Sequence, residues 1–272
     1  MPLVYAASAS HAPGITAWVE GAPTEKKDKI YGAFADLRAG LVASKADVAV
    51  IVAPEHFANF FLNNMPAFCI GRGAHHMGPV EPWLRIERRP IPGDPVFAET
   101  LLNGCYEHGF EPSYSDELEV DHGVALPVHF LIPDGSIPIV PVIINCLTEP
   151  MPSAARCFAF GEAIAAIAAN SDRRVAVIGT GGLSHWPGEA EHGTINEEFD
   201  ATFLKDVLAN DGAALQRYTH EQIAESGTGG HEVRAWIIVA GAVAGWKPEL
   251  LTYQPVHEWA TGCGFVHYQQ AA

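Results

Sequence analysis

The sequence lacks a long apolar run, a paired cysteine motif and an excess of basic residues. No apolar segment approaches the roughly 20 residues that a membrane-spanning helix needs, so no membrane association is expected. The N-terminus has no basic region before its first apolar run, so we expect no signal peptide. The 5 cysteines are scattered without a CxxC pair, which favours reduced thiols in a cytoplasmic protein over a disulfide framework or a zinc–cysteine site.

Basic residues are few relative to acidic ones. The chain has 16 lysines and arginines against 32 aspartates and glutamates, a formal net charge of −16. Such a charge repels a phosphate backbone, so we expect no nucleic-acid partner. It does not exclude an anionic small substrate, because local cations such as Arg85, Arg88 and Arg89 can meet one despite the overall field.

The motifs of several common enzyme classes are also missing. The glycine-rich turn at 179–185 has neither a GxGxxG pattern nor a Walker lysine, so it is a weak candidate for a phosphate site. The absence of a GxSxG elbow disfavours a serine hydrolase of that type. The absence of HExxH likewise disfavours the corresponding class of zinc peptidase.

Apolar runs alternate with helical patterns along the chain. The continuous apolar run at 47–53 is typical of a strand that is buried on both faces. Over 24–43, apolar residues recur three or four positions apart, which predicts an amphipathic helix. Similar patterns predict further strands at 3–8, 66–71, 137–144 and 174–179, and further helices at 95–108, 153–169, 196–208 and 232–243.

The order of these elements indicates the fold class. Strands that alternate with helices at this spacing predict an α/β fold, with a central, largely parallel or mixed sheet flanked by helices. We expect a single catalytic domain over residues 1–272. The proline-rich segment 73–93 is predicted to be a long loop.

Three histidines lie just beyond predicted strands: His11, His56 and His185. Ligands of such sheets collect outside the carboxyl ends of the strands, so we expect the three side chains at one edge. Glu232 is predicted at the start of a helix, where the N-terminus stabilises a carboxylate. Two neutral imidazoles and one carboxylate form a non-haem ferrous site with open positions. His11, His56 and Glu232 are therefore the candidate metal ligands.

His185 and His122 are the candidate acid/base residues. His185 closes the glycine-rich turn, where glycines let the backbone pass close to another group. His122 follows Asp121, and if that carboxylate or a backbone carbonyl holds one nitrogen of the His122 ring, the other faces the cavity as a donor. Each residue has a simpler interpretation when it is taken alone: a satisfied loop or core histidine, an N-cap for Asp121, or a first-turn acid for Glu232. Only their joint placement favours a metal site.

Two other functions fit the same residues. His11, His56 and Glu232 are also a catalytic zinc set, so a zinc-dependent hydrolase on this scaffold is the alternative enzyme. A third hypothesis is a binding or scaffold protein that has kept the fold and lost the chemistry. The intact set of five residues argues against it.

The segments that carry the candidate histidines resemble those of the class III extradiol ring-cleaving dioxygenases. The most specific segments are 10–13 (SHAP), 55–56 (EH), 120–123 (VDHG) and 179–185 (GTGGLSH), with further similarity at 156–159 and 195–200. They occur in the same order as in that family, and the resemblance extends over nearly the whole chain. It implies the LigB-like form of the α/β fold.

The resemblance also implies roles for the five residues. His11, His56 and Glu232 would bind Fe(II), His185 would act as the acid/base, and His122 would lie over the substrate or oxygen site. The reaction implied is cleavage, with O2, of a catechol-type or 2-aminophenol-type ring beside its two hydroxyls rather than between them. The product would be a ring-opened semialdehyde or a related acid.

One segment departs from the protocatechuate branch of this family. Segment 255–262 is more similar to the dihydroxyphenylpropionate branch, and the Ser-Asn pair that contacts a substrate carboxylate in the protocatechuate branch is absent, which disfavours a benzoate-type substrate. The small helical partner domain of some relatives is absent too, so a separate small subunit can complete the pocket. We also expect the chain to form an oligomer.

Overall fold

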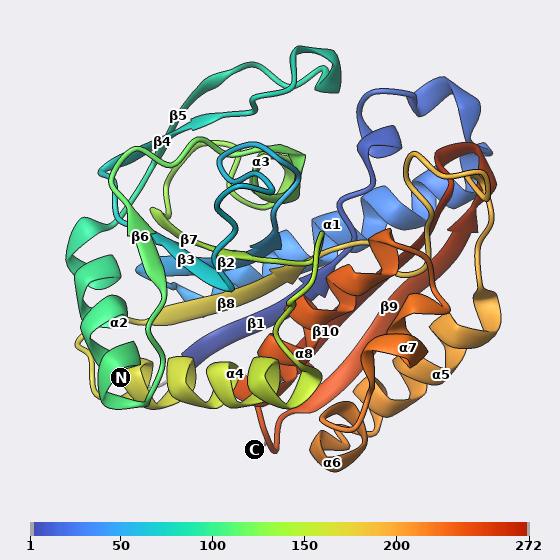
Figure 1. Ribbon diagram of the computed structural model, residues 1–272. Helices are drawn as coiled ribbons and strands as arrows, with labels where there is room; N and C mark the ends of the chain where they lie inside the picture. The colour runs from blue at the N-terminus through green and yellow to red at the C-terminus, as the bar shows by residue number, and fades with distance from the viewer. Residues whose placement is uncertain (1–2, 271–272) are drawn as a thin grey trace.

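The computed structural model describes residues 3–270, in which eight strands form one mixed sheet (Figure 1). The strands are β1 (Leu3–Ala9), β2 (Val48–Pro54), β3 (Phe68–Gly71), β6 (Ser113–Ser115), β7 (Ile139–Ile144), β8 (Val175–Thr180), β9 (Lys247–Val256) and β10 (Thr261–Gln269). Their order in the sheet is β6-β3-β7-β2-β8-β1-β10-β9. The central pairs β7–β2, β2–β8 and β8–β1 are parallel, whereas β10 runs antiparallel to both β1 and β9.

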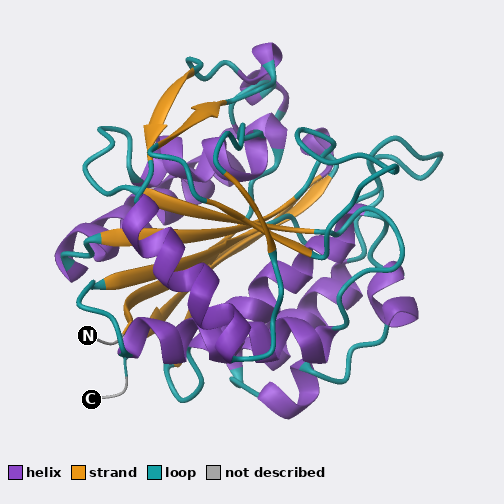
Figure 2. Cartoon of the chain, turned by 60° about the vertical axis from the view of Figure 1, so that its left-hand side comes forward, coloured by secondary structure: helices purple, strands orange, loops and turns teal. Residues whose placement is uncertain are grey.

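Helices cover both faces of this sheet, as Figure 2 shows with the strands nearly edge-on. The helices are α1 (Thr24–Ser44), α2 (Pro95–Glu107), α3 (His122–Leu131), α4 (Ala154–Ala169), α5 (Glu197–Leu208), α6 (Gly212–Leu215), α7 (His220–Ala224) and α8 (Val233–Ala242). Adjacent residues of β2 belong to different cores: Val50 packs in the core that contains Phe160 and Trp236, and Ile51 in the core that contains Phe34. Because side chains alternate along a strand, the apolar run of β2 serves both layers. The predicted fold class is confirmed.

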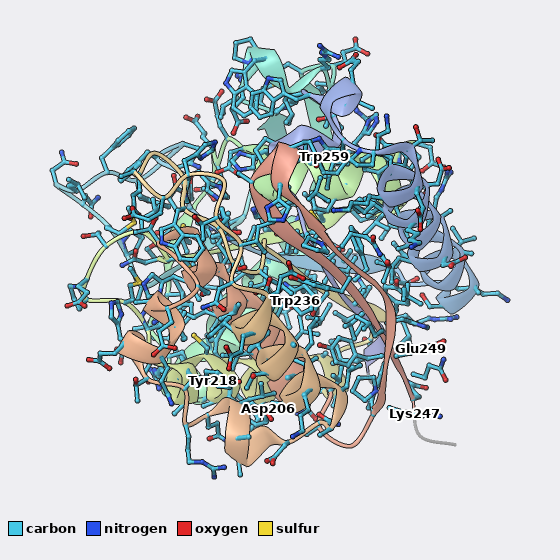
Figure 3. All side chains as sticks on the ribbon, turned by 90° about the vertical axis from the view of Figure 1, so that its right-hand side faces the viewer. Asp206, Tyr218, Trp236, Lys247, Glu249 and Trp259 are labelled. Carbon is cyan, nitrogen blue, oxygen red and sulfur yellow. The ribbon has the colours of Figure 1, made fainter. Side chains whose placement is uncertain are left out.

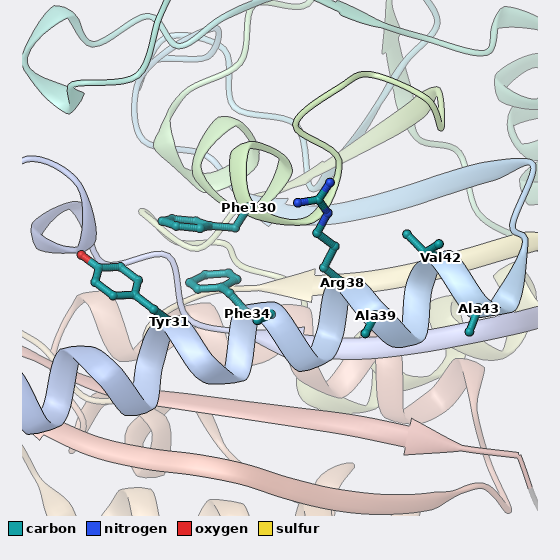
Figure 4. A pocket seen from close by; sticks show the side chains of 8 residues that line it. Tyr31, Phe34, Arg38, Ala39, Val42, Ala43 and Phe130 are labelled. Atoms are coloured by element: carbon teal, nitrogen blue, oxygen red, sulfur yellow. The ribbon is translucent and has the colours of Figure 1, made fainter.

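Helices α1 and α3 share one face of the sheet and contact each other through aromatic rings. Phe34 stacks on Phe130 with ring centroids 4.4 Å apart and an interplanar angle of 17°. A groove of about 670 Å³ lies beside this contact (Figure 4). The groove is lined by Tyr31, Phe34, Ala35, Arg38, Ala39, Val42, Ala43 and Phe130. None of the predicted site residues is among them.

The prediction of a loop over 73–93 is wrong in part, because two short strands form there. Strand β4 (His75–Gly78) pairs antiparallel with β5 (Arg89–Pro92). Pro92 lies opposite His75 and Pro90 opposite Met77. Both strands of a two-stranded sheet are edge strands, where a residue without an N–H donor is tolerated.

The C-terminal hairpin of β9 and β10 was not predicted from the sequence. Figure 3 shows Lys247 at one end of the β9–β10 pair and Trp259 at the turn, and the Trp259 indole donates a hydrogen bond to the Trp18 carbonyl at 3.1 Å. Strand β9 is an edge strand that is largely half-buried or exposed, so it lacks the apolar run that marks β2. Within residues 3–270, no helix has the length and apolar character needed to cross a bilayer.

The contact between α4 and α8 gives a stability prediction. A Cβ atom on Gly161 would lie 1.9 Å from the Ile238 carbonyl oxygen. Helices α4 and α8 are therefore too close together at this position for any residue other than glycine. We expect Gly161→Ala to lower the free energy of unfolding by about 2–3 kcal/mol, measured by denaturant titration. Gly32→Ala in α1 is the matched control, because no atom lies within 4 Å of its added Cβ and helix propensity favours alanine. Equal effects of the two changes would contradict the packing argument.

Candidate functional site

The five predicted site residues converge at one edge of the sheet. His11 follows β1, His56 follows β2 and His185 follows β8, and these three strands are neighbours in the order β2-β8-β1. Glu232 ends a short 3-10 helix and is the N-cap residue of α8, and His122 begins α3. All five line one cavity of about 370 Å³. The sequence prediction that they lie together is therefore confirmed, whereas their separate roles are not tested by their position alone.

Glu232 is the centre of this cluster. Its Oε2 atom lies 3.1 Å from Nε2 of His11, and its Oε1 atom lies 3.1 Å from Nε2 of His56 and 3.4 Å from Nε2 of His185. The backbone N–H of Gly182 donates to Oε2 at 2.6 Å. Burial alone would raise the pKa of Glu232, but the surrounding imidazoles hold it well below its usual value. The buried group is therefore an ionised carboxylate.

His11 presents an unpaired nitrogen to this carboxylate. The Thr180 hydroxyl donates to the Gly123 carbonyl at 2.7 Å, so its oxygen accepts from Nδ1–H of His11 at 3.2 Å. Burial lowers the pKa of His11 to about 4, although Glu232 opposes the shift, so the ring is neutral at pH 7. Its Nε2 is buried and has no hydrogen-bond partner, even though Glu232 is 3.1 Å away. A lone pair that faces a carboxylate oxygen fits a bound cation.

Asp121 fixes the orientation of His56. Nδ1 of His56 donates to Oδ2 of Asp121 at 3.0 Å, while Oδ1 of Asp121 accepts from the Gly123 N–H at 2.8 Å as the N-cap of α3. Burial alone would lower the pKa of His56, but Asp121 and Glu232 raise it well above the usual value. Burial would likewise raise the pKa of Asp121, and His56 instead lowers it to about 2. Asp121 thus holds His56 rather than the ring of its neighbour His122.

The partner of His122 is Glu81, which the sequence did not indicate. Nδ1 of His122 donates to Oε1 of Glu81 at 2.6 Å, and the His122 backbone N–H donates to the same oxygen at 3.1 Å. Glu81 lies 41 residues earlier, in the proline-rich segment that was predicted to be a loop. No local pattern in that segment distinguishes it from an exposed acid.

His185 is held by the backbone on one side and packed against glycine on the other. Its Nδ1 donates to the Leu183 carbonyl at 3.0 Å, which leaves Nε2 directed toward Glu232. A Cβ atom on Gly229 would lie 2.1 Å from that Nε2. Burial alone would lower the pKa of His185, but the charge and hydrogen bond of Glu232 raise it above its usual value. Two glycines therefore lie close to this ring, Gly182 from the turn at 179–185 and Gly229 from the segment before Glu232.

Asp200 holds the loop that carries His185 through hydrogen bonds to Ser184. Its buried carboxylate accepts three hydrogen bonds: from the Ser184 N–H at 2.9 Å, from the Ser184 hydroxyl at 2.8 Å and from the Tyr253 hydroxyl at 2.7 Å. The Ser184 oxygen in turn accepts from the Asn196 N–H at 2.8 Å. The conformation of the loop is therefore tied to α5 and to β9.

These hydrogen bonds predict the effect of removing the acid. We expect Asp200→Ala to lower the free energy of unfolding by about 2–4 kcal/mol, because three buried donors lose their acceptor. Glu198→Ala, an exposed acid in the same helix, is the control and should change stability by less than about 0.5 kcal/mol. The comparison is made by denaturant titration of both variants, and an Asp200→Ala protein as stable as the control would contradict it.

Two sets of side chains at this site could hold a metal ion. His11, His56 and Glu232 offer two imidazoles and a carboxylate, with the short separations given above. His11, His56 and His122 offer three imidazoles, and one nitrogen from each lies within 4.8 Å of the others. Both sets suit a divalent transition metal, and His11, whose Nε2 is unpaired, belongs to both.

Comparison with known proteins places this site in a family context. A family model described as the catalytic LigB subunit of aromatic ring-opening dioxygenase matches residues 5–264. A 2,3-dihydroxyphenylpropionate/2,3-dihydroxicinnamic acid 1,2-dioxygenase of Photorhabdus laumondii subsp. laumondii is 28% identical over a gapped alignment of 298 positions, and the alignment covers 92% of this chain and 93% of the relative. The enzyme with the same description from Rhodococcus rhodochrous is 29% identical over 289 alignment positions, and the alignment covers 88% of this chain and 90% of the relative.

One solved structure with a similar fold is the crystal structure of uncharacterized protein JW3007 from Escherichia coli K12. The TM-score is 0.66, and the match covers 97% of this chain and 99% of the other. The sequence identity is 16%, so this likeness supports the fold and nothing beyond it.

Proposed function

The chain belongs to the LigB family of catalytic subunits of aromatic ring-opening dioxygenases, and from this premise we propose Fe(II)-dependent extradiol cleavage of a catechol-type or 2-aminophenol-type aromatic. The second substrate is O2, and the product is a ring-opened semialdehyde or a related acid. The observation that carries the proposal is the buried Glu232 carboxylate, which lies 3.1 Å from Nε2 of both His11 and His56.

His11, His56 and Glu232 would hold the ferrous ion. Thr180 fixes the tautomer of His11, and Asp121 fixes the ring of His56, so both Nε2 atoms are oriented before a metal arrives. When bound, ferrous iron supplies open positions for the two oxygens of an ortho-diol and for O2, together with a path for electrons between them.

His185 and His122 would handle protons around the ring. In this proposal Nε2 of His185 would accept a phenolic proton from the substrate and later return it, because Nδ1 is already committed to the Leu183 carbonyl. A cation held by Glu232 would offset the negative charge that raises the pKa of His185, which would leave Nε2 free to accept that proton. His122, whose Nδ1 donates to Glu81, contributes its other nitrogen to the cavity wall. The donor bond to Glu81 keeps the ring in one orientation against the substrate.

The cavity suits a small aromatic molecule. Its volume of about 370 Å³ is within the usual range for small-molecule sites and matches a single substituted ring better than a large ligand. Phe57, Leu147 and Pro13 supply apolar walls, which exclude water from the reacting atoms.

Anaerobic loading with Fe(II) followed by oxygen uptake tests this proposal. We expect the loaded protein to consume O2 with at least one member of a panel of catechols and 2-aminophenols, and to form a yellow ring-fission product. Zinc-loaded protein is the control. The alternative enzyme, a zinc hydrolase, needs no O2, so dependence on O2 distinguishes ring cleavage from hydrolysis. Absence of oxygen uptake over the whole panel, with iron bound, would overturn the proposal.

Several further expectations from the sequence stay predictions. They are one catalytic domain over 1–272, a cytoplasmic location, assembly into an oligomer, and a separate small subunit that completes the pocket. Size measurement of the purified chain and a search for a co-purifying small protein test the last two.

A further inference from the structure

The cavity around Glu232 has a lining that suits an uncharged ring substituent. Besides the site residues, it is lined by Ala12, Pro13, Phe57, Leu147, Gly182, Pro187 and Thr261. Within the described part of the chain, no lysine or arginine lines it. We propose, on the basis of the ring-opening function above, that the substrate is a catechol with an apolar alkyl or aryl substituent rather than one with a carboxylate.

The arginines that could meet an anionic substrate are engaged elsewhere. Arg85 pairs with Glu20 at 2.8 Å, and Arg88 pairs with Glu119. Arg89 donates to a backbone carbonyl at 2.8 Å. None of the three lines the cavity, so the cations that the sequence offered for an anionic group do not reach it.

The remaining charged groups near the cavity are unfavourable for a second carboxylate. Arg234, the second residue of α8, is buried and directs its guanidinium to the Pro152 carbonyl at 2.8 Å and to His231 at 2.8 Å. The carboxylates of Glu232 and Asp121 lie at the site itself and offer no partner to another anion. A substrate carboxylate buried in this cavity would have no lysine or arginine among the described lining residues to pair with, which is unfavourable.

Exposed aromatic side chains stand beside the cavity and offer apolar contacts instead. Phe57 lines it and stacks with Phe61 at a centroid distance of 6.2 Å. Trp83 lies 6.2 Å from the His122 ring and stacks on Trp18 at 5.4 Å. These four aromatic side chains are 43–53% exposed, so an apolar substituent that contacts Phe57 or Trp83 would remove apolar area from water.

A matched pair of ligands tests the inference. 3-Propylcatechol and 3-(2,3-dihydroxyphenyl)propionate differ only in a terminal methyl group or carboxylate. Their dissociation constants for the Fe(II)-loaded protein are measured anaerobically by calorimetry, with 3-(2,3-dihydroxyphenyl)propanamide as a neutral polar control. We expect 3-propylcatechol to bind at least about 100-fold more tightly than the propionate, with the amide between them.

The outcomes separate this inference from the proposed function. Equal or tighter binding of the propionate, together with oxygen uptake, would overturn the uncharged-substrate inference and leave ring cleavage intact. Failure of all three ligands to bind would overturn both. Leu147→Arg places a cation in the cavity wall. It should reduce the preference for 3-propylcatechol over the propionate at least about 10-fold, whereas Leu147→Gln should not. An unchanged preference in Leu147→Arg would contradict the claim that missing positive charge sets it.

Discussion

Glu232→Gln is expected to weaken Fe(II) binding at least about 100-fold and to abolish oxygen uptake. Loss of a group that only orients a ligand weakens metal binding about 10- to 100-fold, so loss of a ligand itself should cost more. The amide keeps the size of the side chain and can still accept the hydrogen bond from the Gly182 N–H, so the metal-free protein should stay folded. Anaerobic Fe(II) titration of wild type and variant measures the effect.

Glu225→Gln provides the matched control for this change. It makes the same substitution at an exposed acid in the segment just before the site, and it should bind Fe(II) as wild type does. Wild-type affinity in Glu232→Gln would mean that the carboxylate is not a ligand, and the set of His11, His56 and His122 would then be the better assignment.

His185→Gln is expected to keep iron and to lose turnover by about 10²- to 10⁴-fold, the usual contribution of a positioned acid or base. The reason is geometric, because His185 Nε2 faces the cavity while its Nδ1 is occupied by a backbone carbonyl. Glutamine can keep some contacts but cannot move a proton near neutral pH. The comparison needs iron content and the rate of oxygen uptake for the same samples.

His192→Gln is the control for the histidine change. His192 is an exposed histidine in the same loop region, with its Nδ1 near the Trp186 carbonyl at 3.3 Å, so this variant should turn over normally. A His185→Gln protein with a normal rate would remove His185 from the proposed mechanism. A variant that loses its iron would instead make His185 part of the metal site.

The strands that position the site could be predicted because their signals are local. β1, β2, β7 and β8 are buried on both faces and appear in the sequence as apolar runs. Once parallel strands are expected, the residues that follow them share an edge, which places His11, His56 and His185 together. The same reasoning fails for β9, an edge strand whose residues are largely half-buried or exposed, and for the β4–β5 pair, where prolines indicate a loop.

The partners of the site histidines could not be predicted in the same way. Asp121 reaches His56 across 65 residues, and Glu81 reaches His122 across 41 residues. Such pairs depend on how loops pack over the edge of the sheet. The spacing of apolar residues along the sequence does not predict that packing. Asp121 serves two purposes, because it is the N-cap of α3 and also orients His56.

A crystal structure of the protein loaded anaerobically with Fe(II) tests the central claim most directly. We predict one ion in contact with Nε2 of His11, Nε2 of His56 and the Glu232 carboxylate, with His122 and His185 unbound. An ion held by the three imidazoles of His11, His56 and His122 with Glu232 turned away, or an ion bound elsewhere, would contradict it.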